Sequence, residues 1–445
     1  MTVLKFGGTS VENSKKIDGV LDIAFSQIDK APVLVSSATG KTTNTIEIII
    51  DYAVNGDKAE AIHLTEEIRD RHLKIAEEFL SGGILESAHA DIIELISQFS
   101  SLVKGLTLLH ECSPRSRDAL LSFGELLSTR LIASRAIERG MKTELLDSRQ
   151  LIVTDENFNA AIPDREITDK SIRERVNPEA GKLIITQGFI SSTEKGVTTT
   201  LGRGGSDYSA TIIGSALSAE EVQIWTDVDG IMTSDPRIVK GAKTIKSITY
   251  SEAGELAFFG AKVVHPATIQ PAVKQQIPVW VKNSLNPSAP GTAILPVVDD
   301  RGVKAITGKK AVTVVSIASS NMLNAYGFLK NIFTIFDRYK TSVDLISTSE
   351  VSVSMTIENP DRVDLIVQEL EEMGTVNVEF NKAIICLVGQ ELWKDSVFVS
   401  RVFGSLNGTP IRMISLGASD TNLSIVVPED KMNETIQSLH DEFFL

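Results

Sequence analysis

Short apolar runs that alternate with helical patterns limit the folds open to residues 1–283 more than any other feature of this sequence. The apolar runs have the length of buried strands and lie at residues 3–6, 32–36, 143–146, 182–189, 222–226 and 278–281. Segments of helical spacing separate them, the clearest at residues 44–112, 115–139 and 208–219. Because strands that alternate with helices form parallel sheets with both faces covered, we predict an α/β fold, an αβα sandwich with a mainly parallel central sheet. Ligands of such sheets bind at the carboxyl ends of strands.

A glycine-rich segment precedes one of these helical patterns. Residues 202–207 read Gly-Arg-Gly-Gly-Ser-Asp and lead directly into the pattern at 208–219. Glycines let the backbone approach a ligand closely, and a helix N-terminus offers free N–H groups to an anion. Arg203 can bind a carboxylate or a phosphate through two parallel hydrogen bonds. A dinucleotide fingerprint is excluded because residue 207 is Asp where the third glycine is required. The segment is typical of a site for a small, highly charged molecule.

Three further motifs supply polar side chains, and each has an ordinary structural explanation when taken alone. Lys5 precedes the turn at Gly7 and Gly8, which suits a phosphate cradle but also any strand-to-helix turn. Glu125 lies in a helical pattern, where a solvated side chain is the default. Asp227 follows a predicted strand and stands in a stretch rich in turn residues, where Asx turns are common. The order of these motifs along the chain, rather than any single one, is typical of one binding site.

The region after residue 283 is organised differently. Residues 286–291, Asn-Pro-Ser-Ala-Pro-Gly, are typical of a linker. Beyond them, a helix, a short strand and an alternating strand occur twice, and residues 343–347 resemble residues 411–415. Two copies are too few for a solenoid. We therefore predict a duplicated small α+β module.

Composition and charge exclude several classes of protein. The chain has 445 residues and a formal net charge of −14, whereas a general nucleic-acid binder needs a basic face. Two cysteines cannot form a disulfide framework, which favours the reducing cytoplasm. The six histidines show no metal-ligand spacing, so we expect no metal held by the protein alone. We see no signal-peptide pattern and no run of the ~18 apolar residues that a membrane span needs, so we expect no membrane partner.

Taken together, the motifs resemble those of the aspartokinases, within the amino-acid kinase superfamily. The resemblance rests on KFGGTS (5–10), SFGE (122–125), QGFI (187–190), TTTLGRGGSDYSA (198–210), WTDVDGI (225–231), TSDPR (233–237) and FGAKVVHPAT (259–268). The duplicated module resembles a pair of ferredoxin-like ACT domains, and residues 321–329 and 342–350 are most similar to monofunctional, lysine-sensitive members. The resemblance implies a catalytic domain at 1–290, a first ACT module at 305–380 and a second at 381–445 that packs with a strand near 303–307.

The implied reaction is the transfer of a phosphoryl group from ATP to the side-chain carboxylate of L-aspartate, the first step of lysine, threonine and methionine biosynthesis. That carboxylate is ionised at neutral pH, so no general base is needed, and Mg²⁺ would be held mainly by phosphates and water. The implied catalytic pair is Lys5 and Asp207. The implied ATP contacts are Lys5, Phe6, Gly7, Gly8, Thr226, Asp227, Met232, Arg237, Lys262 and Val263. The implied aspartate contacts are Thr43, Glu125, Arg203, Gly204, Gly205 and Ser206.

Two departures from the usual pattern of the family fall at the implied substrate and ATP contacts. The loop before Thr43 is one residue longer than usual, so Thr42 is an alternative substrate contact. Met232 stands where relatives often carry a tyrosine near the adenine, and a methionine can still pack on the base.

The resemblance also implies feedback inhibition by L-lysine in a homodimer joined through the ACT modules, with a tetramer as the alternative. The implied effector residues are Met322, Ala325, Phe328, Leu329, Ser342, Val343, Asp344, Ser349 and Glu350. The acidic Asp344 and Glu350 favour a cationic effector over threonine, whereas ordinary packing is the alternative role for the apolar members.

Two other functions stay open at this point. A glutamate 5-kinase or acetylglutamate kinase would keep the fold, although Glu125 would have no ammonium to meet in an N-acetylated substrate. A non-catalytic amino-acid sensor would need a broken catalytic set, whereas Lys5, Arg203, Asp207 and Lys262 are all present.

Overall fold

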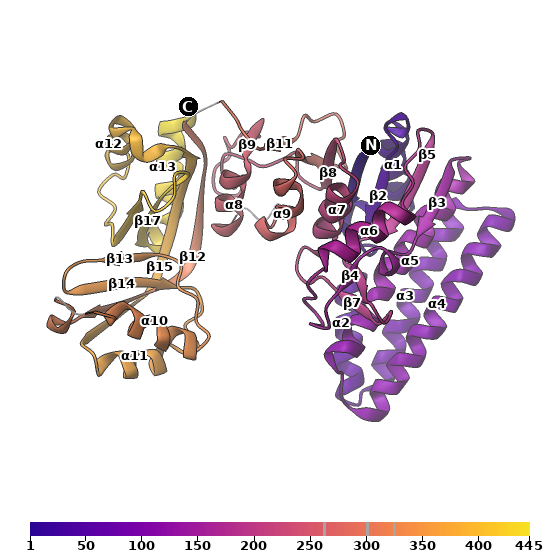
Figure 1. The fold of residues 1–445 in the computed structure, drawn as a ribbon, viewed down its shortest axis with the longest axis horizontal. Helices are drawn as coiled ribbons and strands as arrows, with labels where there is room; N and C mark the ends of the chain where they lie inside the picture. Colours follow the sequence, from indigo (N-terminus) through magenta and orange to yellow (C-terminus); the bar gives the residue numbers. More distant parts are fainter. Residues whose placement is uncertain (261–263, 300–301, 324–325) are drawn as a thin grey trace. The chain divides into compact units, whose positions relative to one another are not determined.

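The computed structural model describes residues 1–260, 264–299, 302–323 and 326–445, which form two compact units. The first unit comprises Met1–Ile231 and Val263–Val297, and the second comprises Met232–Lys262 and Val298–Leu445. The boundary between the units therefore does not follow the order of the sequence, because the segment from Met232 belongs to the second unit although the chain later returns to the first (Figure 1).

The first unit alternates strands and helices, as the apolar pattern predicts. Its helices are α1 (Ser14–Phe25), α2 (Thr42–Val54), α3 (Lys58–Phe79), α4 (Gly82–Leu109), α5 (Pro114–Glu138), α6 (Arg165–Arg175), α7 (Gly205–Ala216) and α9 (Pro266–Lys274). Its strands are β1 (Thr2–Phe6), β2 (Val33–Ser36), β3 (Lys142–Leu146), β4 (Val153–Thr154), β5 (Lys182–Gln187), β6 (Ile190–Thr193), β7 (Thr198–Thr200), β8 (Glu221–Thr226), β10 (Val279–Asn283) and β11 (Thr292–Leu295).

The main sheet of this unit has the strand order β3-β5-β2-β1-β8-β10-β11. All neighbouring pairs are parallel except β10 and β11, which are antiparallel. The strands β4, β6 and β7 form a small separate sheet in the order β4-β6-β7. The Pro- and Gly-rich residues 286–291 form the turn between β10 and β11, so the prediction that they link two domains is wrong.

The two faces of the main sheet are covered because alternate residues of each strand point to opposite sides. Leu4 and Phe6 join the core formed with α1 and α5, whereas Val3 packs near Gly214 of α7 on the other face. The observed layers confirm the predicted αβα sandwich with a mainly parallel sheet.

The long helices α3, α4 and α5 pack side by side (Figure 1). Among the described residues, α4 is long and apolar enough to cross a membrane if only its length and composition are considered. Asp91, Glu94 and Lys104 interrupt its apolar character, and one face of the helix joins the hydrophobic core with α2, α3 and α5. This pattern is typical of the amphipathic core helix of a globular domain.

The second unit is built on one antiparallel sheet with the order β13-β14-β12-β15-β17-β16. The strands of this sheet are β12 (Gly302–Ala318), β13 (Ile346–Thr348), β14 (Ser352–Ile357), β15 (Thr375–Gln390), β16 (Met413–Leu416) and β17 (Asn422–Pro428), and the short strand β9 (Ser247–Thr249) is not one of them. The helices of the unit are α8 (Tyr250–Phe258), α10 (Phe328–Arg338), α11 (Val363–Glu371), α12 (Ser396–Gly404) and α13 (Met432–Phe444). The long strands β12 and β15 run through both halves of the sheet, and α10 with α11 and α12 with α13 cover separate cores. The predicted duplication of an α+β module is confirmed.

The segment that begins at Met232 packs into the second half of this sheet. Val239 is fully buried in the core formed with α12 and α13. Thr233 accepts a hydrogen bond from the backbone N–H of Ile306 through its carbonyl oxygen, and its hydroxyl lies 3.0 Å from Nε2 of His440. Glu255 of α8 accepts a 2.6 Å hydrogen bond from Asn422. This segment therefore folds as part of the C-terminal unit.

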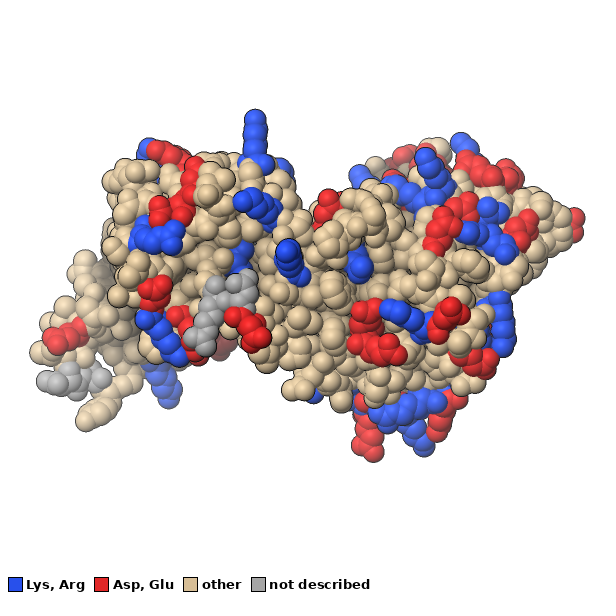
Figure 2. All heavy atoms as spheres, turned by 90° about the horizontal axis from the view of Figure 1, so that it is seen from above, with Lys and Arg blue, Asp and Glu red and all other residues tan. Residues whose placement is uncertain are grey.

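Charged side chains of both signs are interspersed on the face of the molecule that Figure 2 shows. Basic residues in this view stand singly or beside acidic ones rather than in one extended area. Such a distribution is typical of a solvated surface.

Candidate active site

The carboxyl ends of four parallel strands meet in register in the first unit. Phe6 of β1 is paired with Ser36 of β2 and with Trp225 of β8, and Ser36 is paired with Gln187 of β5. The strand order reverses at β1, because β2 lies on one side and β8 on the other, and such switch points are where open α/β sheets bind ligands. A pocket of about 320 Å³ opens beside these ends. Its lining residues are Lys5, Gly8, Ser37, Ala38, Gly40, Thr43, Glu125, Phe189, Gly202, Gly204, Gly205, Ser206 and Asp207.

Lys5 and Asp207, the predicted catalytic pair, meet in this pocket. Nζ of Lys5 lies 2.7 Å from Oδ1 of Asp207, and each side chain is only about one-eighth exposed, at 12% and 13%. Lys5 comes from β1 and Asp207 from the first turn of α7, so the pair joins the sheet to the helix. A poorly solvated ammonium held by a carboxylate can neutralise charge on a phosphoryl group.

The turn at Gly8 requires a residue without a side chain. A Cβ at this position would lie 2.7 Å from the carbonyl oxygen of Gly40 and 2.8 Å from that of Ala38. The backbone N–H of Gly40 donates a 3.0 Å hydrogen bond to the carbonyl of Gly8. Residues 8 and 38–40 therefore form two adjacent backbone segments at the pocket, as a phosphate cradle requires.

The two candidate threonines at the start of α2 have different surroundings. Thr43 lines the pocket. Thr42 is fully buried, where its hydroxyl donates to the carbonyl of Thr39 and accepts a hydrogen bond from Arg71. The geometry favours Thr43 as the substrate contact.

Glu125 is a buried carboxylate that lacks a full set of partners. It is 3% exposed, and Oε1 accepts a 3.1 Å hydrogen bond from the backbone N–H of Ala38. Oε2 is buried without a hydrogen-bond partner. Burial raises the pKa of Glu125 from 4.5 to about 8, because the charged form loses its hydration. The charged form of such a carboxylate is stabilised when a ligand brings a cationic group beside it.

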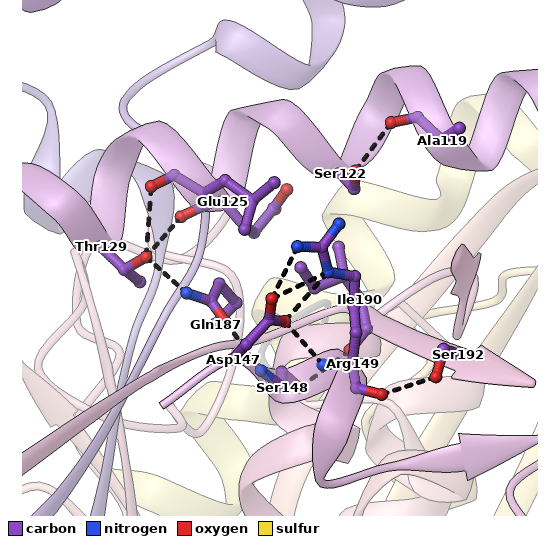
Figure 3. Close-up of polar contacts among 11 residues, drawn as sticks. Ala119, Ser122, Glu125, Thr129, Asp147, Ser148, Arg149, Gln187, Ile190 and Ser192 are labelled. Carbon is purple, nitrogen blue, oxygen red and sulfur yellow. Dashed lines mark hydrogen bonds and ion pairs between the residues drawn. The ribbon is translucent and has the colours of Figure 1, made fainter. Parts of the chain in front are cut away.

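A polar network holds the turn of α5 that carries Glu125. The hydroxyl of Thr129 donates to the carbonyl of Glu125 at 2.9 Å and accepts a 2.8 Å hydrogen bond from the side chain of Gln187. The carbonyl oxygen of the same Gln187 amide accepts from the backbone N–H of Ser148 (Figure 3). The network ties α5 to the end of β5, next to the pocket.

The glycine-rich segment forms the N-terminus of α7. Gly204 is the N-cap in a left-handed conformation, with φ of 71°, and Gly205 and Ser206 begin the helix at the pocket wall. The hydroxyl of Ser206 accepts a 2.9 Å hydrogen bond from Ser37. The side chain of Arg203 is exposed beside the pocket and does not line it.

The predicted ATP contacts fall in several places. Phe6 is fully buried and stacks on Trp225, with ring centroids 5.9 Å apart, so a contact with ATP would have to come from its backbone. Gly7 lies close to Lys5, since a Cβ there would stand 3.5 Å from Nζ. Thr226 and Asp227 lie at the end of β8, where the threonine hydroxyl donates to the aspartate at 3.3 Å.

The other predicted ATP contacts fall in the second unit or outside the described residues. Met232 and Arg237 belong to the second unit. Arg237 is exposed and forms an ion pair with Asp235, at 2.6 Å from Nη2 to Oδ2, which lowers the pKa of that carboxyl. Lys262 and Val263 lie outside the described residues.

The predicted effector residues lie in the first half of the C-terminal sheet. Met322, Phe328 and Val343 are partly buried and pack against the core under α10 and α11. Leu329, Ser342, Ser349 and Glu350 are exposed, and Ala325 lies outside the described residues. Burial raises the pKa of Asp344 to about 6, and its Oδ2 is buried without a hydrogen-bond partner. Asp344 therefore resembles Glu125 as a carboxylate that suits a cation.

Sequence reasoning missed several residues of the pocket wall, among them Ser37, Ala38 and Phe189. Ser37 and Ala38 directly follow β2, and Phe189 follows β5 by two residues. All three come after the carboxyl end of a parallel strand, which was the signal that could have identified them.

Comparison with known proteins agrees with this geometry. Residues 1–283 match the amino acid kinase family, and residues 385–443 match an ACT domain. Aspartokinase 1, chloroplastic, of Arabidopsis thaliana is 38% identical over 463 residues, covering 99% of this chain and 80% of that protein. The lysine-sensitive aspartokinase 3 of Escherichia coli is 37% identical and covers 100% of this chain and 99% of that protein.

A solved structure extends the likeness to three dimensions. The crystal structure of Escherichia coli aspartokinase III in complex with aspartate and ADP has a TM-score of 0.84 and 37% identity, with complete coverage of both chains. A family match over more than half of the sequence and relatives of this similarity over nearly full length lead to one conclusion. The chain belongs to the aspartokinases, within the amino acid kinase family.

Proposed function

We propose that this chain transfers the γ-phosphoryl group of ATP to the side-chain carboxylate of L-aspartate, which gives 4-phospho-L-aspartate and ADP. The observation that carries the proposal is the pocket of the first unit, which is lined by both the Lys5–Asp207 ion pair and the partly unsatisfied carboxylate of Glu125. The ion pair suits a phosphoryl group in transfer, and the Glu125 carboxylate suits the α-ammonium of an amino acid.

The chemistry needs little from the protein beyond position and charge. A carboxylate oxygen of aspartate forms a bond to the γ-phosphorus as the bond to the β-phosphate oxygen breaks, and the electron pair leaves with ADP. The nucleophile is already ionised, so no base has to take a proton. Lys5 neutralises charge on the transferring group, while Asp207 orients the ammonium of Lys5.

The residues around the pocket fit a metal that arrives with the nucleotide. The described residues contain no group of three or more His, Cys, Asp and Glu side chains that could hold an ion by itself. Mg²⁺ would therefore be held mainly by the ATP phosphates and water, as is usual for this ion.

An assay of ADP release with separate acceptors tests the reaction. We expect turnover with aspartate, little with glutamate and none with N-acetylglutamate, because the acetylated nitrogen cannot be an ammonium for Glu125. Turnover with glutamate or N-acetylglutamate but not aspartate would indicate the related kinases. Binding of lysine without binding of ATP, measured by calorimetry, would indicate a sensor without activity.

We further propose that L-lysine inhibits the enzyme in a cytoplasmic homodimer. Asp344, with its unpartnered oxygen, is the best-placed carboxylate for the lysine ammonium, and the relative in Escherichia coli is named lysine-sensitive. The exposed strand β13 offers a free edge for a second subunit. Both cysteines are free thiols, which agrees with a reducing compartment. Light scattering with and without lysine separates a dimer from a tetramer.

A further inference from the structure

Asp118 is a buried carboxylate that the reaction itself does not use. It lies in the first turns of α5, is 0% exposed and does not line the pocket. Its two oxygens accept from the backbone N–H of Asn159, at 3.0 and 3.1 Å, and from Thr200, at 3.0 Å from the backbone N–H and 2.7 Å from the hydroxyl. Burial raises the pKa of Asp118, and these hydrogen bonds oppose the shift.

These hydrogen bonds join three segments that are distant in sequence. Thr200 is the last residue of β7 and stands directly before the segment that leads to Arg203 and α7. Asn159 lies against the same segment, because its carbonyl oxygen is 3.0 Å from where a Cβ on Gly202 would stand. Gly202 itself has a φ of 72°, which only glycine adopts without strain. The carboxylate of Asp118 therefore fixes the path of the chain into the pocket wall.

The same helix carries the other end of the amino-acid site. Asp118 and Glu125 are seven residues apart, which is about two turns of α-helix and places them on the same face of α5. Under the proposed function, Glu125 meets the α-ammonium of aspartate, and Arg203 with the N-terminus of α7 meets the α-carboxylate. The spacing between these two groups is then set by α5 through Asp118.

We propose that Asp118 is a positioning residue of the aspartate site, which holds residues 200–204 at a fixed distance from Glu125; this inference rests on the proposed aspartate kinase function. Its role is to match the separation of the ammonium and carboxylate groups of an α-amino acid. The nucleotide is bound by other segments, so the effect of Asp118 falls on aspartate and not on ATP.

The substitution Asp118→Asn tests this assignment. The amide keeps the shape but removes the negative charge and replaces one acceptor oxygen with a donor, so in either orientation two of the four hydrogen bonds from Asn159 and Thr200 lose their acceptor. We expect the aspartate KM to rise by about 10- to 100-fold, the range set by one hydrogen bond to a charged group, while the ATP KM changes by less than about twofold.

Asp147→Asn is the matched control. Asp147 belongs to the same unit, is half-buried and pairs with Arg149 at 2.6 Å, but it makes no hydrogen bond to the segments that Asp118 joins (Figure 3). We expect both KM values of this variant to stay near those of the parent. A second pair, Thr200→Val and Thr200→Ser, decides the question if Asp118→Asn does not fold. The valine variant should raise the aspartate KM, and the serine variant, which keeps the hydroxyl donor, should restore it.

Equal rises in both KM values, or a fall in kcat alone, would overturn the positioning role. So would a valine variant that matches the serine variant. The parent enzyme is measured first with aspartate and ATP, and an absence of turnover there would contradict the proposed function rather than the role of Asp118. In that case amide hydrogen exchange at residues 199–204 still tests whether Asp118 holds this segment. Asp118→Asn should speed the exchange there, and Asp147→Asn should not.

Discussion

Replacing Glu125 by Gln should separate the stability of the protein from its activity. In the folded protein the pKa of Glu125 is about 8, against 4.5 for an unperturbed glutamate. Between these values the folded state binds a proton that the unfolded state has released, so the free energy of unfolding falls as the pH rises through this window. At about 1.4 kcal/mol for each pH unit, the loss is about 3 kcal/mol by pH 7 and about 5 kcal/mol above pH 8.

The amide of the Glu125→Gln variant does not titrate. The variant should therefore gain stability relative to the parent as the pH rises from 5 to 9, by about 3–5 kcal/mol in the difference between the two proteins. The cost of burying the amide does not depend on pH, so it cancels when the stability difference between the two proteins is compared at two pH values. Urea denaturation followed by fluorescence at pH 5, 7 and 9 measures it, and other titrating groups cancel because both proteins contain them.

The same substitution should damage aspartate binding. In the parent, the ammonium of aspartate requires the ionised carboxylate, so binding releases a proton below pH 8 and the aspartate KM should fall as the pH rises from 6 to 8. The change approaches tenfold for each pH unit. The variant should have a high aspartate KM without this pH dependence. Two results would refute the reasoning: parallel stability profiles of the two proteins, or an aspartate KM of the parent that does not change between pH 6 and 8.

Three further predictions concern other parts of the molecule. Lys5→Met should lower kcat by about 100-fold or more, with the fold intact by circular dichroism, because it removes the charge beside the phosphoryl group; a kcat near that of the parent would exclude Lys5 from catalysis. Asp344→Ala should relieve inhibition by lysine with little change in the uninhibited rate, and inhibition of the parent should weaken below about pH 6 as the carboxyl becomes protonated; equal inhibition of both proteins would contradict the effector assignment. Glu255→Ala should destabilise the C-terminal unit by about 1–3 kcal/mol in urea, because Asn422 loses a partly buried acceptor; an unchanged midpoint would show that the hydrogen bond contributes nothing.

The sequence was informative wherever hydrophobic spacing decides the structure. The apolar run at residues 222–226 and the helical spacing at 115–139 correspond to β8 and α5 within one residue at each end, because burial on a sheet or a core face imposes the period. The meeting of Lys5 and Asp207 was implied by the resemblance to the aspartokinases and not by strand spacing, because Asp207 begins α7 after β7 of the small sheet.

Long-range packing could not be anticipated in the same way. Nothing in the local pattern of residues 232–260 shows that Val239 lies in a core with α12 and α13, since that core is assembled from residues far along the chain. Asp118 likewise looks like a solvated residue near a helix start, and its three donors come from Asn159 and Thr200 in other segments. The choice between Thr42 and Thr43 likewise depends on a distant residue. Arg71 of α3 donates a hydrogen bond to the hydroxyl of Thr42, and Thr43 is the threonine that lines the pocket.

The packing of residues 232–260 has a practical consequence for dissecting this protein. A chain shortened after residue 297 would keep every residue of the amino-terminal unit, yet it would leave Val239 without its hydrophobic neighbours and Thr233 and Glu255 without Ile306, His440 and Asn422. Such a fragment would expose apolar side chains of this segment that are buried in the full protein, in the stretch that also carries the predicted ATP contacts Met232 and Arg237. Inactivity or aggregation of that fragment would therefore say nothing about allosteric control.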